Sequence, residues 1–245
     1  MSIDWRPTGL AILLVALSWA PMAQPAPERE GIGGELGGAY LAPASPGDQA
    51  TKALFAVTGV VIAARTIGLN TDTGTWPPAV EGTLTDDELH ELFGLVRPVS
   101  EVIVRVDRVE GTSGGLAVGD QISLYVLGGR FGFELEPEDA AAIGLKVPVG
   151  DEEVDDPQFA LPEEPITLYK EFRAPSVLVD QRVFAFVRPA QIPTVPSGLA
   201  KSVWVASDDL GSGIYRLSEG LATNARSGES FPEGTLWALF ASAQG

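Results

Sequence analysis

Two strand-like stretches joined by glycines lie at the middle of the chain and constrain its fold more than any other feature. One runs from Val102 to Val109 and the other from Val118 to Gly129, with a glycine-rich turn at 111–115 between them. Apolar and polar side chains alternate in both: Val102, Val104 and Val106 against Arg105 and Asp107, then Ile122, Leu124 and Val126 against Gln121 and Ser123. A period of two is typical of strands with one buried face, so the pattern predicts a β-hairpin in a half-buried antiparallel sheet.

An uncharged apolar run of 12 residues, from Gly9 to Ala20, follows Arg6 near the N-terminus. Twelve helical residues rise about 18 Å, which is too short for a hydrocarbon core of about 30 Å. Small residues follow the run, as they do before a signal peptidase cleavage site. We therefore expect residues 1–23 to be a secretory signal peptide and the mature protein to be secreted or periplasmic. A retained N-terminal anchor is the alternative.

The chain has no cysteine, and 33 acidic against 16 basic residues give it a net charge of -17. The lack of cysteine excludes disulfides, thiol catalysis and thiolate metal sites, so stability must come from an apolar core. A strongly negative surface repels phosphate backbones, which argues against nucleic acid as a partner. No second apolar run approaches the length of a membrane span, so we expect no integral span in the mature chain.

Composition divides the chain into a leader and one domain. Residues 24–50 are rich in Pro, Gly and Ala and are expected to form a flexible leader, and residues 51–245 a single domain. A bent first strand is expected over Leu54–Arg65, with Gly59 at the bend, followed by a loop over 66–84. Further strands are expected at Ile166–Phe172, Arg182–Arg188, Ser202–Ala206 and Ile214–Leu217. Short helices are expected from the capping box at Thr85 to Gly94, and at Pro137–Ile143 and Thr235–Ala241.

Roughly six strands with few helices, separated by Gly and Pro turns, predict a mainly β protein. The expected architecture is an antiparallel barrel with short peripheral helices and long loop insertions. The acidic run Asp151–Asp156 is expected to be a solvated part of one insertion, since it lacks the ligand spacing of a calcium loop. Calcium binding by this run remains an open alternative.

A series of short motifs carries a resemblance to a protein family. The motifs are Val109-Glu-Gly111, Val118-Gly-Asp-Gln-Ile122, Gly128-Gly129, Val179–Val187 and Gly213–Gly220. Over residues 51–243 their order resembles exported bacterial proteins of unknown function with an OB-like β-barrel. The resemblance implies turn and bulge positions at Gly119-Asp120 and Gly128-Gly129, and it implies no activity. The chain departs from the group in having Asp180 in place of a common Gly and long insertions at 66–98 and 130–165.

One motif suggests catalysis. Ser113 lies in a Gly-x-Ser-x-Gly sequence, but a strand follows it, whereas a hydrolase nucleophile elbow leads into a helix. The only histidine, His90, falls within a predicted surface helix and has no cysteine or second histidine to share a metal. We therefore expect no metal and no cofactor. A secreted hydrolase that uses Ser113 or a pair of carboxylates remains the alternative function.

Aromatic residues in or beside loops are the candidate ligand-binding residues: Trp76, Phe131, Phe133, Tyr169 and Trp204. Such side chains could line the concave ligand surface that OB-like barrels use. Phe184 and Phe186 share one strand face and are expected in the core. The favoured function is an exported, soluble, non-catalytic module that binds a protein, a peptide or a glycan, because large loops lie on a compact scaffold without a catalytic constellation.

Overall fold

The computed structural model describes residues 44–76, 85–111, 115–149, 158–195, 200–207 and 211–245. The expected signal peptide 1–23, the leader up to residue 43, the acidic run 151–156 and Ser113 all lie outside the described residues. Helix α1 (Pro46–Lys52) begins within the segment that is expected to be a leader, and its Gln49 is buried. Ordered structure therefore begins before residue 51.

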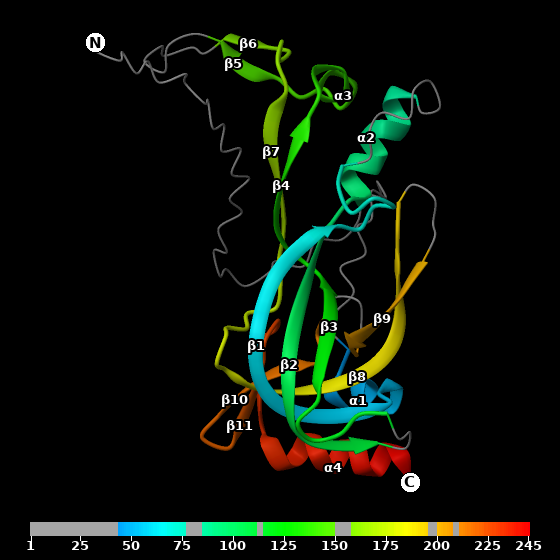
Figure 1. Cartoon of the computed structure of the whole chain (residues 1–245), viewed down its shortest axis with the longest axis vertical. Helices are drawn as coiled ribbons and strands as arrows, with labels where there is room; N and C mark the ends of the chain where they lie inside the picture. Colours follow the sequence, from blue (N-terminus) through cyan, green and yellow to red (C-terminus); the bar gives the residue numbers. More distant parts are fainter. Residues whose placement is uncertain (1–43, 77–84, 112–114, 150–157, 196–199, 208–210) are drawn as a thin grey trace, which may run out of the picture.

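The protein is mainly β, with one large sheet and a few short helices, as the sequence predicts (Figure 1). The large sheet has eight strands: β1 (Phe55–Leu69), β2 (Pro98–Gly111), β3 (Gln121–Leu127), β8 (Arg182–Pro193), β9 (Ala200–Ala206), β10 (Ile214–Ser218), β11 (Leu221–Asn224) and β12 (Ser230–Pro232). Among the described residues, no helix combines the length and the apolar character that crossing a membrane requires.

Five of these strands are joined by hydrogen bonds into a circuit that returns to its first strand. β1 pairs with β2, β2 with β3, β9 with β8 and β8 with β1, all antiparallel. β3 and β9 are parallel, which differs from the purely antiparallel arrangement that the sequence suggests. β10, β11 and β12 continue the sheet from β8. Figure 1 shows β1 and β8 curving upward on opposite sides of the sheet.

The central hairpin has the pairing that its alternation predicts. Val102 lies opposite Leu124 and Val104 opposite Ile122, and all four side chains are buried in one apolar core. Gly128 and Gly129 have φ of 145° and 122°, a region that favours glycine, and they direct the chain out of β3. The core on this side of the sheet is therefore built mainly from alternate residues of the circuit strands.

The bend expected at Gly59 is present as a shift of register between Thr58 and Gly59 in the β1–β2 pairing. A Cβ at Gly59 would overlap the backbone oxygen of Arg105 and lie 2.7 Å from Cγ1 of Val104. Glycine is needed here because the two backbones approach closely. Beyond the bend β1 continues to Leu69, so the loop expected from residue 66 begins later in the chain.

A second core lies between the sheet and two helices at the lower end of the molecule in Figure 1. The helices are α1 and α4 (Glu233–Gln244), and α4 confirms the helix expected at 235–241. Phe184 and Phe186 are fully buried here, as expected, and their rings contact Trp237 and Phe240 of α4. The Tyr215 hydroxyl donates to Oε1 of Gln49 at 2.5 Å, which ties α1 to β10.

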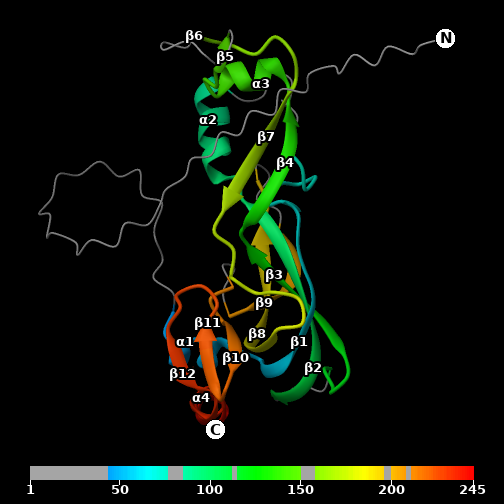
Figure 2. The ribbon, with the colours of Figure 1, turned by 90° about the vertical axis from the view of Figure 1, so that its left-hand side faces the viewer.

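The upper lobe, at the other end of the molecule, occupies the long insertions (Figures 1 and 2). It consists of α2 (Asp86–Leu95), β4 (Gly129–Leu135), α3 (Pro137–Ala142), β5 (Val147–Val149), β6 (Gln158–Ala160) and β7 (Ile166–Phe172). The predicted capping box of α2 is present, because Thr85 and Glu88 each accept a hydrogen bond from the backbone of the other. β4 pairs with β7, which confirms the strand expected at Ile166–Phe172, and α3 confirms the helix expected at Pro137–Ile143. β4, β5 and β6 are strands where a loop is expected.

Candidate functional site

Three of the five candidate aromatic residues form the apolar core of the upper lobe. Trp76 and Phe133 are 5% and 7% exposed, and their rings stack with centroids 5.3 Å apart and planes 9° from parallel. Phe93 contacts the same indole ring, and Phe131 packs against the edge of this cluster. Because these rings are buried against one another, they stabilise the lobe and offer little surface to a ligand.

Tyr169 lies on the surface of the β4–β7 pair, opposite Gly132. A Cβ on Gly132 would lie 2.8 Å from the tyrosine ring, so the ring covers this glycine directly. The guanidinium of Arg130 lies 4.4 Å from the ring centre. The tyrosine is thus held in place by its own strand pair.

Trp204 lies on β9 and is 37% exposed. Its ring meets the ring of Phe55 edge to face, with centroids 5.7 Å apart. The structure therefore brings together Trp76, Phe131 and Phe133, and places Tyr169 and Trp204 on two other surfaces.

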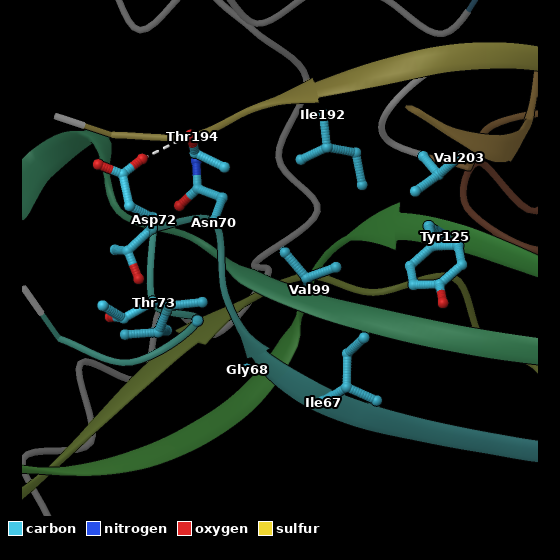
Figure 3. Close-up of a pocket in the computed structure, with 13 residues that line it drawn as sticks. Ile67, Gly68, Asn70, Asp72, Thr73, Val99, Tyr125, Ile192, Thr194 and Val203 are labelled. Atoms are coloured by element: carbon cyan, nitrogen blue, oxygen red, sulfur yellow. Dashed lines mark hydrogen bonds between the residues drawn. The ribbon is translucent and has the colours of Figure 1, made fainter. Parts of the chain in front are cut away.

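A hollow with a volume of about 500 Å³ lies where β1 and β8 end (Figure 3). We call it the face hollow. Its lining consists of Ile67, Gly68, Leu69, Asn70, Thr71, Asp72, Thr73, Gly74, Val99, Tyr125, Ile192, Thr194 and Val203. Hollows of 300–1,000 Å³ with apolar walls and a few polar groups are the usual form of small-ligand sites.

The apolar wall of the face hollow follows from strand alternation. Val99 and Tyr125 alternate with Val102 and Leu124, whose side chains belong to the core. Successive side chains of a strand point to opposite faces, so the wall lies on the face of β2 and β3 turned away from that core. Figure 3 shows Val99, Tyr125 and Ile192 projecting toward a common space from three different strands.

Two connections that are remote in sequence meet at the polar side of the face hollow. The backbone N–H of Val195 donates to the backbone carbonyl oxygen of Asn70 at 3.0 Å. The hydroxyl of Thr194 donates to Oδ1 of Asp72 at 2.7 Å. The backbone N–H of Arg97 donates to Oδ1 of Asn70 at 2.5 Å, which orients that carboxamide. These bonds join the β1–β2 connection to the end of β8 and border the hollow on one side.

Tyr125 is held at the wall by a charged neighbour. Its hydroxyl donates to Oε1 of Glu101 at 3.3 Å, while the guanidinium of Arg65 lies 3.1 Å from Oε2. Burial acts to raise the pKa of Glu101, but hydrogen bonds from Ser123 and Arg65 outweigh it and hold that pKa below its ordinary value. Burial and the adjacent Glu101 carboxylate raise the pKa of Tyr125. The phenol therefore stays protonated at neutral pH beside an ionised carboxylate.

The described lining of the face hollow combines apolar side chains with a few polar groups. Among the described residues of its lining, Asp72 is the one with a charged side chain, and its Oδ1 accepts a hydrogen bond from Thr194. The single histidine, His90, is exposed on α2, outside this lining. Among the described residues, no three His, Asp or Glu side chains gather in a way that could hold a metal ion. The arrangement can bind a ligand through apolar contact and hydrogen bonds.

Sequence reasoning did not identify the residues of the face hollow. Tyr125 carried a signal, since it is an aromatic residue at a position where the hairpin alternation expects a polar face. Ile67, Asn70 and Thr194 carried none, because only the closure of the strand circuit brings them together.

No family model, no curated protein and no solved structure matches this chain.

Proposed function

We propose that this chain is an exported, non-catalytic binding module built on an OB-like barrel, and that the face hollow is its ligand site. The circuit of β1, β2, β3, β9 and β8 supports the barrel, since each of these strands pairs with two neighbours in the circuit. The upper lobe then comes from two insertions: the one that holds α2 lies between β1 and β2, and the one that runs from β4 to β7 lies between β3 and β8.

The observation that carries the proposal is the position of the face hollow in the strand order. Counted along the chain, β1, β2, β3, β8 and β9 are barrel strands one to five. The hollow lies on the face of strands two and three, and its rim comes from the connections between strands one and two and between strands four and five. OB-like barrels bind oligosaccharides and oligonucleotides on this face and between these two connections.

The chemistry of the lining favours a short uncharged glycan. Thr73 and Thr194 supply hydroxyl groups at the rim, and Tyr125 supplies a flat apolar surface beside aliphatic walls. The carboxylate of Asp72 and the net charge of -17 repel phosphate, which disfavours an oligonucleotide in the same place. A peptide would meet the same groups, so peptide probes form a second arm of the test.

Binding can be measured by calorimetry and by saturation-transfer NMR with chitohexaose, cellohexaose, maltohexaose and hexa-alanine. We expect one of the three glycans to bind and Tyr125→Ala to weaken its binding by about tenfold or more, the loss of a buried contact worth at least about 1.4 kcal/mol. Tyr169→Ala is the matched control, since Tyr169 is a partly exposed tyrosine outside the hollow, and this variant should bind as the unaltered chain does.

The result can contradict the proposal in three ways. Binding of hexa-alanine alone would replace the glycan with a peptide. Equal affinity of the Tyr125→Ala variant would place the ligand elsewhere. Chromatographic detection of shortened glycans after incubation would show catalysis.

Export rests on the apolar run Gly9–Ala20 and the small residues that follow it. N-terminal sequencing of the protein recovered from the medium or periplasm of a bacterial host should find a new terminus near residue 24. Recovery of the intact N-terminus from the membrane fraction would favour the anchor instead.

A further inference from the structure

A second hollow, of about 430 Å³, lies at the end of the strand circuit where β2 passes into β3. We call it the end hollow. Its apolar lining comes from Phe55, Leu116, Ile122 and Trp204, and Asp120 is the charged residue among its lining side chains. Hollows of this kind occur preferentially in the mouths of β-barrels.

The end hollow is separate from the face hollow because β9 presents one residue to each. Val203 lines the face hollow and Trp204 lines the end hollow. Consecutive residues of a strand point to opposite faces, so the two hollows lie on opposite sides of β9. A ligand of one can therefore be studied without occupying the other.

Trp204 is a large aromatic residue in partial contact with water. Trp204 is 37% exposed although its ring already meets that of the buried Phe55, with centroids 5.7 Å apart and planes 61° from parallel. Covering large aromatic surface is favourable, so a ligand that lies on this ring gains from its burial.

The charge of the end hollow selects the kind of ligand. Oδ2 of Asp120 accepts a hydrogen bond from the backbone N–H of Ala117 at 2.8 Å, which holds the carboxylate beside the apolar lining. A carboxylate next to an exposed indole favours cations, because the ring face attracts positive charge as well. The net charge of -17 adds a long-range attraction of the same sign.

Other aromatic rings of this chain already make cation–π contacts with Lys or Arg side chains. A Lys or Arg of the chain itself lies over the rings of Phe93, Tyr169, Phe172 and Trp237. At Trp237 the guanidinium carbon of Arg108 is 3.7 Å from the ring centre. The ring of Trp204 lines the end hollow.

We infer that the end hollow binds an organic cation, an ammonium or guanidinium group on an apolar stem. The cation lies between the Trp204 ring and the Asp120 carboxylate, and the stem contacts Phe55 and Ile122. The source can be a free amine or a basic side chain of a peptide. This site is independent of the proposed glycan site on the other side of β9.

The test uses the full chain and follows the indole N–H resonance of Trp204, which is assigned by comparison with the Trp204→Phe variant. The probes are choline, Nα-acetyl-lysine methylamide and its neutral counterpart Nα-acetyl-norleucine methylamide. We expect one of the two cations to shift this resonance with a millimolar dissociation constant and the neutral probe to bind about fivefold more weakly. Choline alone would identify a free amine as the source, and the lysine derivative would identify a peptide side chain.

Three variants separate this site from general attraction to an acidic protein. Trp204→Leu should weaken binding by about two- to fivefold, the range of an exposed cation–π contact. Asp120→Asn should weaken it by a similar factor, since Asn keeps the acceptor for Ala117 but not the charge. Glu163→Gln removes a charge from an exposed residue of the upper lobe and should leave binding unchanged.

The inference is overturned if the neutral probe binds as tightly as the cations. It is also overturned if Glu163→Gln weakens cation binding as much as Asp120→Asn does. If the Trp204→Leu variant fails to fold, the resonance shifts of the unaltered chain still test the site. A shift of the Trp76 or Trp237 resonance without one at Trp204, or no shift with either cation, would contradict the site.

Discussion

Thr194 donates a hydrogen bond to Asp72 across 122 positions of sequence, with 2.7 Å between Oγ1 of Thr194 and Oδ1 of Asp72. Beside it, Thr71 and Val195 form an isolated parallel bridge. Together these contacts join the end of β1 to the end of β8, so they hold the polar rim of the face hollow in one shape.

A double-mutant cycle can measure this contact. We expect Asp72→Ala and Thr194→Val to be coupled by about 0.5–1 kcal/mol in the free energy of unfolding, because the hydrogen bond has a charged acceptor but is exposed to water. Urea unfolding of the two single variants and the double variant provides the numbers. Strictly additive effects would show that the side-chain contact contributes nothing and that the backbone bridge holds the rim alone.

Replacement of Gly59 by Ala should destabilise the protein by about 2 kcal/mol or more, since the new Cβ overlaps the backbone of Arg105 and neither strand can move aside easily. Gly234→Ala is the matched control. Nothing lies within 4 Å of a Cβ at Gly234, which is in α4, so Ala should raise stability by about 0.5–1 kcal/mol. The free energy of unfolding of both variants is measured with denaturant. An equal change in the two variants would refute the close approach of β1 and β2.

Trp76 should affect stability much more than ligand binding. Trp76→Ala removes a buried ring and should cost about 3–5 kcal/mol. Trp76→Phe should cost less than about 2 kcal/mol, because a ring remains and the buried indole N–H has no hydrogen-bond partner among the described residues. The measurement is chemical unfolding together with glycan affinity at a temperature where both variants are folded. If a Trp76 variant lost glycan affinity without a decrease in its free energy of unfolding, Trp76 would be a ligand-binding residue.

Lys170 should make stability depend on pH in the alkaline range. Its Nζ donates a hydrogen bond to the backbone carbonyl oxygen of Phe93 at 2.6 Å. Burial lowers the pKa of Lys170 from 10.5 to about 8, and the charge of Arg97 adds to this effect. Between these values the unfolded chain binds more protons at this residue than the folded one, so the free energy of unfolding should rise with pH. The useful window is pH 8 to 10, because above pH 10 the raised pKa of Tyr125 acts in the opposite direction.

The comparison that isolates this effect is Lys170→Met against Lys146→Met, which replaces an exposed lysine near α3. The free energy of unfolding of each variant is measured at intervals from pH 7 to pH 10. Its slope against pH should differ between the two variants. The Lys146→Met variant should keep the rise of the unaltered chain, and Lys170→Met should lose it. Parallel curves for all three proteins would contradict the lowered pKa.

Local patterns predicted the parts of the fold that depend on neighbours in sequence. The alternation around Val104 and Leu124 predicted their pairing and burial, and the capping box at Thr85 predicted the start of α2. Both features depend on contacts within one hairpin or one helical turn. Periodicity could not show that Trp76 would stack on Phe133, because those rings come from segments whose approach depends on the packing of the whole upper lobe.

The face hollow lies beyond local prediction for the same reason. Val99 and Ile192 line one wall although 93 positions separate them, and each looks like an ordinary apolar strand residue in the sequence. Their approach depends on the pairing of β1 with β8 and of β3 with β9.

By itself the sequence determined a mainly β chain with a central hairpin, the positions of three short helices, a strongly acidic surface and a core that no disulfide supports. Only the tertiary structure decided which strands close the circuit and which aromatic side chains remain in contact with water. The physical reason is range. Backbone periodicity and helix capping act over a few residues, whereas Trp76 was buried and Trp204 left partly exposed by contacts between strands that are far apart in the chain.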